Sequence, residues 1–347
     1  PDGNLGERND LRCLSVEEKL GIHGSPTCVM SYGNNSGAIG FLVGQENQGL
    51  AAMFTMMNNA RLNIGISGLA IAERSYQQAR DYAKQRTQFG AIINHPDVRR
   101  TLMLMKSQIE AMRAVTYDAA LALDGAKRYA EESERLQAQA RVDLLIPMVK
   151  GWCTDLGVEI SSLALQVHGG AGYIAETGIA QHYRDARIAP IYEGTNGIQA
   201  IDLVGRKVLR DKGTAMSAFV NDARTVLKQA KTDGKSRSIV AAVEEALNEL
   251  ATTTNWLVKN AASDQAIALS GATAYLRLFG TVAGGVMHAQ AAQIAASQAA
   301  DHDTNFYTAK LVSAHFYIEH VLPQIAALGI SIRNGHPSIM ALDKDQF

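Results

Sequence analysis

Glu193 lies in a short stretch whose residue types suit proton-transfer chemistry. Pro190 ends one helical pattern, Gly194 and Gly197 permit unusual backbone angles, and apolar residues resume at helical spacing over residues 198–204. The glutamate is therefore predicted to sit on a tight connection between two helices. The residues before it are apolar, and a carboxylate in such surroundings is a stronger base, as removal of a proton from a weakly acidic C–H bond requires. On spacing alone, a solvent-facing glutamate near a helix N-terminus is an open alternative.

Three segments of the chain form an ordered pattern: Arg-Thr-Gln-Phe-Gly at residues 86–90, Gln-Val-His-Gly-Gly-Ala-Gly-Tyr at 166–173, and Tyr-Glu-Gly-Thr followed by Ile-Gln at 192–199. They closely resemble segments of the acyl-CoA dehydrogenases, in the same order. The resemblance implies that Glu193 is the catalytic base that removes the α-proton of an acyl-CoA thioester, while FAD accepts the β-hydrogen as hydride. In the family, the backbone N–H of this glutamate and a flavin ribityl hydroxyl hold the thioester carbonyl. Electrons then pass to an electron-transfer flavoprotein, in fatty acid metabolism.

The resemblance also assigns residues to the cofactor and the substrate. The positions expected to contact FAD are Arg86, Phe89, Gln166, Gly169, Gly170, Thr195 and Asn196. Arg86, Phe89 and Gln166 would reach the FAD of a neighbouring subunit, which implies a homodimer or a dimer of dimers. Without the resemblance, Arg86 and Phe89 would be read as a cation and a hydrophobic cap at a helix end.

Arg61 and Gly194 are expected to contact the substrate, again on the resemblance. A salt bridge from Arg61 to a neighbouring helix is an equally open alternative. Asn58 stands where the family often has an acidic residue, so the contact made there in the family is in doubt for this chain. His168 occupies a position that the family varies, and we assign it no chemistry.

We predict no metal site in this chain. Among the histidines near the C-terminus, His302, His315 and His320, the latter two are spaced for different helix faces. The three cysteines are far apart and form no Cys-x-x-Cys pair, which argues against a zinc site and against a disulfide framework. We therefore expect a reducing compartment, the cytoplasm or, in a eukaryote, the mitochondrial matrix.

The composition is that of an ordinary globular chain. Its 347 residues are 47% hydrophobic and 19% charged, enough to bury one large core or two smaller ones. A net charge of -1 gives no field that would attract nucleic acid or an anionic membrane. The most apolar run, residues 265–300, is interrupted by Arg277 and His288, so we expect no membrane span.

The periodicity predicts a mainly α-helical fold that follows the end of a small β-domain. Short strand-like segments, separated by Gly, Pro, Asn and Ser clusters, are expected at residues 11–16, 28–32 and 38–43. On the resemblance they are the closing strands of the family's central β-domain. The opening strands and the N-terminal helical domain are expected to be absent here, and the chain begins without an initiator Met. We place this part at residues 1–46.

Apolar residues recur at helical spacing through the rest of the chain. The helices of the C-terminal dehydrogenase domain, residues 47–212, are expected at about 50–82, 97–132, 134–167, 177–187 and 194–209. An added helical bundle at 213–347 is expected from Ala-rich amphipathic segments at about 215–231, 236–259, 264–297 and 304–328, with a loop at 231–236. Some larger acyl-CoA dehydrogenases, including the type that acts on 3-methylmercaptopropionyl-CoA, look similar in carrying such an extension.

Three other functions remain open at the level of sequence. An acyl-CoA oxidase shares the base but passes its electrons to oxygen. A nucleic-acid-protecting relative of the same fold would require a basic face in the extension, which the near-neutral charge disfavours. The added bundle could also serve only in oligomerisation.

Overall fold

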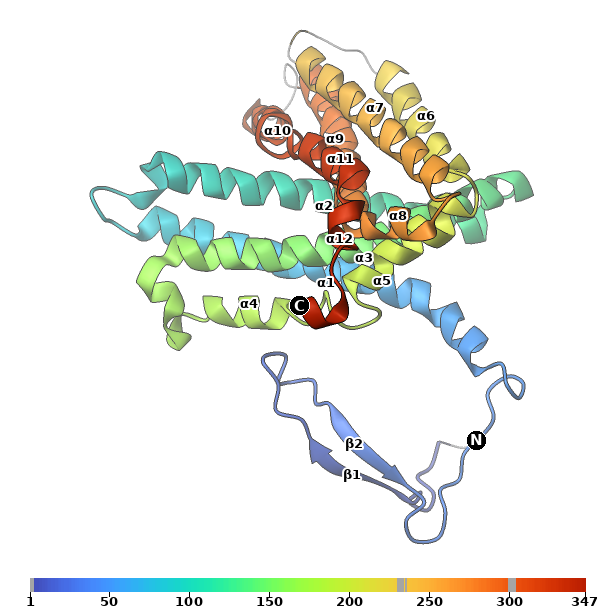
Figure 1. Cartoon of the computed structure of the whole chain (residues 1–347). Helices are drawn as coiled ribbons and strands as arrows, with labels where there is room; N and C mark the ends of the chain where they lie inside the picture. Colours follow the sequence, from blue (N-terminus) through green and yellow to red (C-terminus); the bar gives the residue numbers. More distant parts are fainter. Residues whose placement is uncertain (1–2, 230–233, 235, 299–303) are drawn as a thin grey trace. The chain divides into compact units, whose positions relative to one another are not determined.

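The structure is a computed structural model that describes residues 3–229, 234, 236–298 and 304–347. It divides into two compact units, Pro1–Asn58 and Asn59–Phe347, which are described separately below (Figure 1). The predicted loop at 231–236 falls mostly outside the described residues, and His302 lies outside them as well.

The first unit contains a two-stranded antiparallel sheet. Strand β1 (Leu11–Val16) pairs with β2 (Cys28–Tyr32), and both strands lie where the sequence predicts them. The third predicted strand, at 38–43, is wrong. The side chain of Asn9 forms hydrogen bonds with both backbone groups of Ile39. It donates to the carbonyl at 2.7 Å and accepts from the N–H at 2.9 Å. Because these groups are bonded to a side chain, they are not available for a strand ladder.

Three long helices form the base of the helical unit, and Figure 1 shows them side by side: α1 (Gly49–Gln85), α2 (Pro96–Arg128) and α3 (Glu132–His168). The predicted long helices are confirmed. Helix α2 begins at a proline, which is favourable because the first N–H of a helix has no intrahelical partner. Helix α3 continues through Pro147.

Helices α1 and α3 cross with their backbones in contact. A Cβ atom on Gly68 would lie 2.5 Å from the carbonyl oxygen of Cys153, and one on Gly157 would lie 2.9 Å from the carbonyl oxygen of Gly68. No side chain fits between the helices at this point. The crossing therefore fixes the distance between the polar residues that lie along the two helices, Arg61 on α1 and Lys150 on α3.

After α3, short elements lie on both sides of the predicted catalytic stretch. They are the 3₁₀ turns η2 (Gly169–Tyr173) and η3 (Ala175–Thr177), helix α4 (Ile179–Ala186), helix α5 (Asn196–Ile201) and the π-helix η4 (Asp202–Leu209). A further 3₁₀ turn, η1 (Ile92–Asn94), precedes α2. The Thr195 hydroxyl caps α5 by accepting a bond from the Ile198 N–H at 3.3 Å. Glu193 thus lies on the connection between α4 and α5, as the sequence predicts.

The C-terminal third of the chain is a second set of helices. Its elements are α6 (Thr214–Gln229), α7 (Arg237–Asn260), α8 (Gln265–Ser270), α9 (Ala272–Gln298), α10 (Thr304–Phe316), the π-helix η5 (Tyr317–Val321), α11 (Gln324–Asn334), α12 (His336–Ile339) and the 3₁₀ turn η6 (Lys344–Gln346). The predicted single helix at 264–297 is wrong in one respect, because it is divided at Gly271. A Cβ there would meet the side chain of Ile332 on α11 at 3.1 Å, so a tertiary contact occupies the position.

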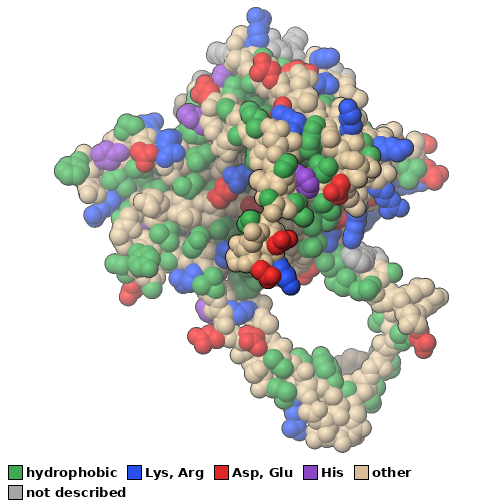
Figure 2. All heavy atoms as spheres, in the orientation of Figure 1, with side chains coloured by type: hydrophobic (Ala, Val, Ile, Leu, Met, Phe, Trp, Pro, Cys, Tyr) green, Lys and Arg blue, Asp and Glu red, His purple; other side chains and the backbone are tan. Residues whose placement is uncertain are grey.

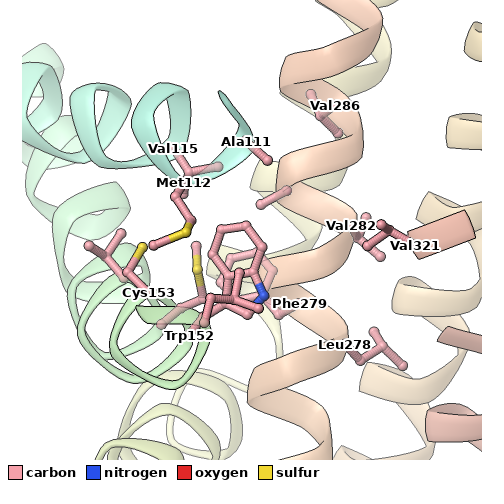
Figure 3. Packing of buried hydrophobic residues seen from close by; sticks show 14 of the residues in the cluster. Ala111, Met112, Val115, Trp152, Cys153, Leu278, Phe279, Val282, Val286 and Val321 are labelled. Atoms are coloured by element: carbon pink, nitrogen blue, oxygen red, sulfur yellow. The ribbon is translucent and has the colours of Figure 1, made fainter. Parts of the chain in front are cut away.

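One hydrophobic core joins these helices to α2 and α3. Figure 3 shows Trp152 and Cys153 of α3 and Met112 of α2 facing Phe279 of α9. Gly280 lies against the Trp152 ring so closely that any Cβ there would overlap it. Residues on both sides of the proposed boundary at 212–213 therefore belong to the same core.

Two surface properties bear on the expected partners. On the face shown in Figure 2, acidic and basic side chains are interspersed over the helices, without the continuous basic surface typical of nucleic-acid binding. Within the described ranges, no helix combines the length and apolarity that a membrane span needs.

Candidate active site

The base turn, residues 192–196, holds Glu193 in an unusual backbone conformation. Glu193 has φ 56° and Gly194 has φ 82°, so two successive residues are left-handed. A non-glycine residue there is strained by about 1–2 kcal/mol. Glu193 is half-buried. Its backbone N–H makes no hydrogen bond to any described residue and is therefore a free donor next to its own carboxylate.

Two side chains hold the carbonyls of the base turn. The ammonium of Lys150 donates to the Gly194 carbonyl at 2.7 Å and to Asn196 Oδ1 at 2.8 Å. Gln199 Nε2 donates to the carbonyls of Gly194 and Glu193 at 3.2 and 3.4 Å. The turn is therefore fixed by a helix on each side, α3 through the lysine and α5 through the glutamine.

Asn196 ties the turn to the backbone of α3. Its Nδ2 donates to Asp155 Oδ1 at 2.7 Å and to the Gly151 carbonyl at 3.0 Å. Its backbone N–H donates to the Pro190 carbonyl at 2.9 Å. The side chain predicted to contact FAD is thus bonded within its own chain, and its contact with FAD stays a prediction. The same holds for Thr195, which is exposed and caps α5.

The side of the turn that faces α3 carries two ionisable groups, the buried Lys150 and the half-buried Asp155. The pKa of Lys150 is lowered to about 8, mainly by burial and also by the charge of Arg61, while the charges of Asp155 and Glu193 oppose this shift. Burial also raises the pKa of Asp155, although the bond from Asn196 opposes this. In such a site, hydrogen bonds and charges act more strongly than they do in water.

Arg61 forms the salt bridge that the sequence left open. Its Nη1 lies 3.2 Å from Asp202 Oδ2 on η4, and the two side chains are only 10% and 9% exposed. A Cβ on Gly194 would lie 3.8 Å from Arg61 Nη2, so the guanidinium also borders the base turn. Arg61 Nε and Gln199 Oε1 are buried without a hydrogen-bond partner among the described residues. The free Arg61 donor suits an acceptor group such as the carbonyl of a thioester.

The outer turn, residues 86–90, holds the second group of predicted residues. Phe89 has φ 55° and is 96% exposed, and Gly90 has φ 103°. The turn is closed by its own backbone, since the Gln88 N–H donates to the Gly90 carbonyl at 2.8 Å. The Arg86 side chain is exposed and has no hydrogen bond or ion pair within the described part of the chain. An exposed cation next to an exposed aromatic ring suits a flat, anionic cofactor that approaches the turn from its solvent-exposed side.

The end of α3 lies beside the outer turn. His168 is buried and its ring stacks on Tyr82 near the end of α1, with centroids 4.3 Å apart. The histidine, to which the sequence assigned no chemistry, thus joins the two helix ends. Gln166, Gly169 and Gly170 are exposed there. The residues expected at the cofactor of a neighbouring subunit therefore gather at one end of the helices.

The base turn and the outer turn are far apart. At about 1.5 Å of rise per residue, α1 extends about 36 Å from Arg61 to its end at Gln85. By the same measure, Lys150 and Gln166 are about 24 Å apart along α3. The structure therefore separates the predicted residues into two groups, one at the base turn and one at the outer turn and the neighbouring end of α3.

Lys150 was missed by the sequence analysis. A signal was present, because it is the lone charge in the apolar run Leu-Leu-Ile-Pro-Met-Val-Lys-Gly-Trp-Cys at residues 144–153. A lysine kept in such a run needs a buried partner. No three His, Cys, Asp or Glu side chains gather as metal ligands among the residues the structure describes.

Comparison with known proteins agrees with this geometry. Residues 47–209 match the family model of the acyl-CoA dehydrogenase C-terminal domain, and residues 214–343 match the model described as acetyl-CoA dehydrogenase C-terminal like. The chain is 42% identical over 337 residues to 3-methylmercaptopropionyl-CoA dehydrogenase of Ruegeria pomeroyi, covering 94% of this chain and 57% of that protein. It thus spans a little over half the length of this relative.

Two solved structures share the fold. Caenorhabditis elegans ACDH-11 in complex with C11-CoA superposes with a TM-score of 0.72 at 24% identity, over 90% of this chain and 51% of that one. An acyl-CoA dehydrogenase of Bacillus anthracis complexed with FAD gives a TM-score of 0.72 at 18% identity, over 97% and 57%. The ordered motifs, the two matching family models and the 42% identical relative lead to one conclusion. The chain belongs to the acyl-CoA dehydrogenase family.

Proposed function

We propose that the full-length protein removes hydrogen from the α and β carbons of an acyl-CoA thioester and releases the 2-enoyl-CoA. One observation carries the proposal: Glu193 presents a half-buried carboxylate and a free backbone N–H on the same left-handed turn. The carboxylate takes the α-proton. The N–H donates to the thioester carbonyl, where negative charge develops as the proton leaves.

FAD, when bound, accepts the β-hydrogen as hydride. The chain's own part is to hold the base, bind the thioester and exclude water. Gly194 and Arg61, which lie beside Glu193, are the residues that we propose to contact the thioester. A related protein from Ruegeria pomeroyi is named for 3-methylmercaptopropionyl-CoA, and ACDH-11 is seen with C11-CoA, so the substrate class we propose is a CoA thioester of undefined acyl length.

The separation of the two turns supports a homodimer or a dimer of dimers. Arg86, Phe89 and Gln166 lie too far along α1 and α3 to serve the same site as Glu193 of their own subunit. We propose that they hold the FAD of a partner subunit, with Gly169 and Gly170 allowing close approach of the backbone. An electron-transfer flavoprotein in the cytoplasm, or in the matrix of a mitochondrion, would take the electrons in fatty acid metabolism.

The test is the visible absorption of the purified full-length protein, titrated without oxygen with a panel of acyl-CoAs. The expected result is a yellow protein that bleaches with at least one member of the panel and yields the matching 2-enoyl-CoA. A colourless protein, or a flavin that no acyl-CoA bleaches, would contradict the proposal. Reoxidation by air, compared with reoxidation by an electron-transfer flavoprotein, then separates an oxidase from a dehydrogenase.

A further inference from the structure

Lys150 is a buried cation that makes no salt bridge within the described residues. Its side chain is 0% exposed, and its ammonium is bonded to a carbonyl and an amide oxygen. Asp155 and Glu193 act on this charge without pairing with it directly. Burying a charged group without a direct ion pair costs several kcal/mol in most proteins, and an apolar side chain would pack at this position at lower cost. The lysine therefore needs an explanation other than stability of the fold.

In the base turn, the Gly194 carbonyl needs a hydrogen-bond donor, and Lys150 supplies one. With both Glu193 and Gly194 left-handed, the Gly194 carbonyl points into the protein toward α3. Gln199 also donates to this carbonyl, so loss of the lysine would remove the shorter of its two hydrogen bonds. A hydrogen bond to a charged group contributes about 1.5–3 kcal/mol, enough to favour another backbone conformation at a strained turn. Any such change would rotate the carboxylate and the free N–H of Glu193 away from their present directions.

The lysine acts on the turn at two points. It donates to the Gly194 carbonyl, directly after Glu193, and to Asn196 Oδ1, the residue at which α5 begins. Asn196 is in turn bonded to Gly151 and Asp155 on the helix that carries the lysine. A closed network thus connects α3 to the second strained residue, Gly194, and to the start of α5.

We propose that Lys150 is a positioning residue for the reaction, holding Glu193 in the left-handed conformation through the Gly194 carbonyl and Asn196. The inference rests on the proposed function, in which Glu193 is the base. It assigns to Lys150 no contact with substrate or cofactor. Its effect is on the rate of proton removal, because a misplacement of about 1 Å costs on the order of 10²-fold in rate.

The experiment compares Lys150→Met, Lys150→Gln and Lys310→Met in the full-length protein. Met removes the donors at similar length, whereas Gln keeps two N–H donors without the charge. Lys310 pairs with Glu110 at 2.9 Å, a carboxylate that also contacts Lys106, and serves as the matched control. The readouts are the flavin bleaching rate at saturating acyl-CoA, the concentration for half-maximal rate, and exchange of the α-hydrogen with deuterated water.

The expected result is a split between rate and binding. Lys150→Met should bleach about 10²-fold more slowly at saturation and lose α-exchange in parallel, with the half-saturating concentration changed less than about threefold. Lys150→Gln should fall in between, and this milder change keeps the test decisive if the Met variant does not fold. Lys310→Met should match the wild type.

Two outcomes would overturn the inference while the proposed function stands: a Lys150→Met rate within about threefold of the wild type, or equal losses in Lys150→Met and Lys310→Met. A Lys150 variant with weaker substrate binding and an unchanged saturated rate would also count against it. If the wild type bleaches with no acyl-CoA, the proposed function itself fails, and the inference fails with it.

Discussion

The base turn and the outer turn share a backbone motif and differ in what supports it. Each places a non-glycine residue in the left-handed region directly before a glycine that is also left-handed: Glu193 at 56° and Phe89 at 55°. Lys150 and Gln199 hold the carbonyls of the base turn from neighbouring helices. The outer turn has its own backbone bonds, and its aromatic side chain is 96% exposed.

The difference separates a turn held by side chains of two neighbouring helices from a turn that lies at the surface. Strained backbone persists only where its surroundings determine it. At the base turn those surroundings are all on this chain, so the position of Glu193 is set before any ligand binds. At the outer turn the support comes from its own backbone bonds and from His95, whose Nε2 lies 2.9 Å from the Gln88 carbonyl oxygen, while the side chains of Arg86 and Phe89 are exposed. The following variants test this contrast, beginning with the largest expected effect.

Glu193→Gln in the full-length protein should stop the chemistry and leave binding intact. The amide keeps the size of the side chain but cannot take a proton, so bleaching should slow by about 10²- to 10⁴-fold. Acyl-CoA affinity, measured by the spectral shift of the flavin on titration, should stay close to that of the wild type. Bleaching at a near wild-type rate would show that the base lies on another helix.

Gly68→Ala should destabilise the protein, because its methyl group would overlap the backbone of α3. Overpacking of this kind costs about 1–3 kcal/mol, and here two helix backbones must move apart. Gly205→Ala, in η4, is the matched control, because a Cβ there meets nothing closer than 3.9 Å. The unfolding temperatures of the two variants should differ by several degrees, and equal values would contradict the close α1–α3 crossing.

Arg86→Ala should weaken FAD retention and dimerisation together. Loss of a hydrogen bond to a charged group costs about 1.5–3 kcal/mol, or about ten- to a hundredfold in affinity. A ligand bound across an interface stabilises the assembled state, so light scattering should show more monomer as flavin is lost. Arg128→Ala, at the exposed end of α2, should change neither. A monomer with full flavin content would exclude the shared site.

Arg277→Met should have the smallest effect. The guanidinium joins α9 to Glu159 on α3 at 2.6 and 3.1 Å, but the two side chains are 40% and 41% exposed. Such pairs contribute about 0.2–1 kcal/mol to folding. The unfolding free energy should therefore fall by less than about 1 kcal/mol, and the bleaching rate should stay within about threefold. A large loss of rate would mean that the extension acts on the base turn through charge.

The long elements could be predicted because their periodicity is local. Strands β1 and β2 and the long helices α1 to α3 lie close to their expected residues. The errors arose where a distant residue decides the structure: Asn9 binds Ile39 and prevents a third strand, and Ile332 packs on Gly271 and divides a predicted helix. Nothing within a few residues of residue 39 or 271 signals these contacts.

The site residues could be predicted from the sequence where they lie in recognisable motifs. Glu193 was placed on the connection between two helices from Pro190 and two glycines, whereas its left-handed φ and free N–H needed the structure. The salt-bridge alternative for Arg61 is confirmed, since its partner Asp202 is only 3.2 Å away. Lys150 was missed because its partners, Gly194 and Asn196, are remote in sequence and act through a carbonyl and an amide.

The left-handed backbone of Glu193 also has an evolutionary consequence. At φ 56° a glycine carries no steric penalty, so folding alone favours glycine at this position while catalysis favours glutamate. The two residues are one base change apart in the genetic code. A gene copy released from selection for activity therefore gains stability by the same step that removes its base. Descendants of this chain that keep the fold with glycine at residue 193 are expected to be those that have abandoned the reaction or have placed its base on another element.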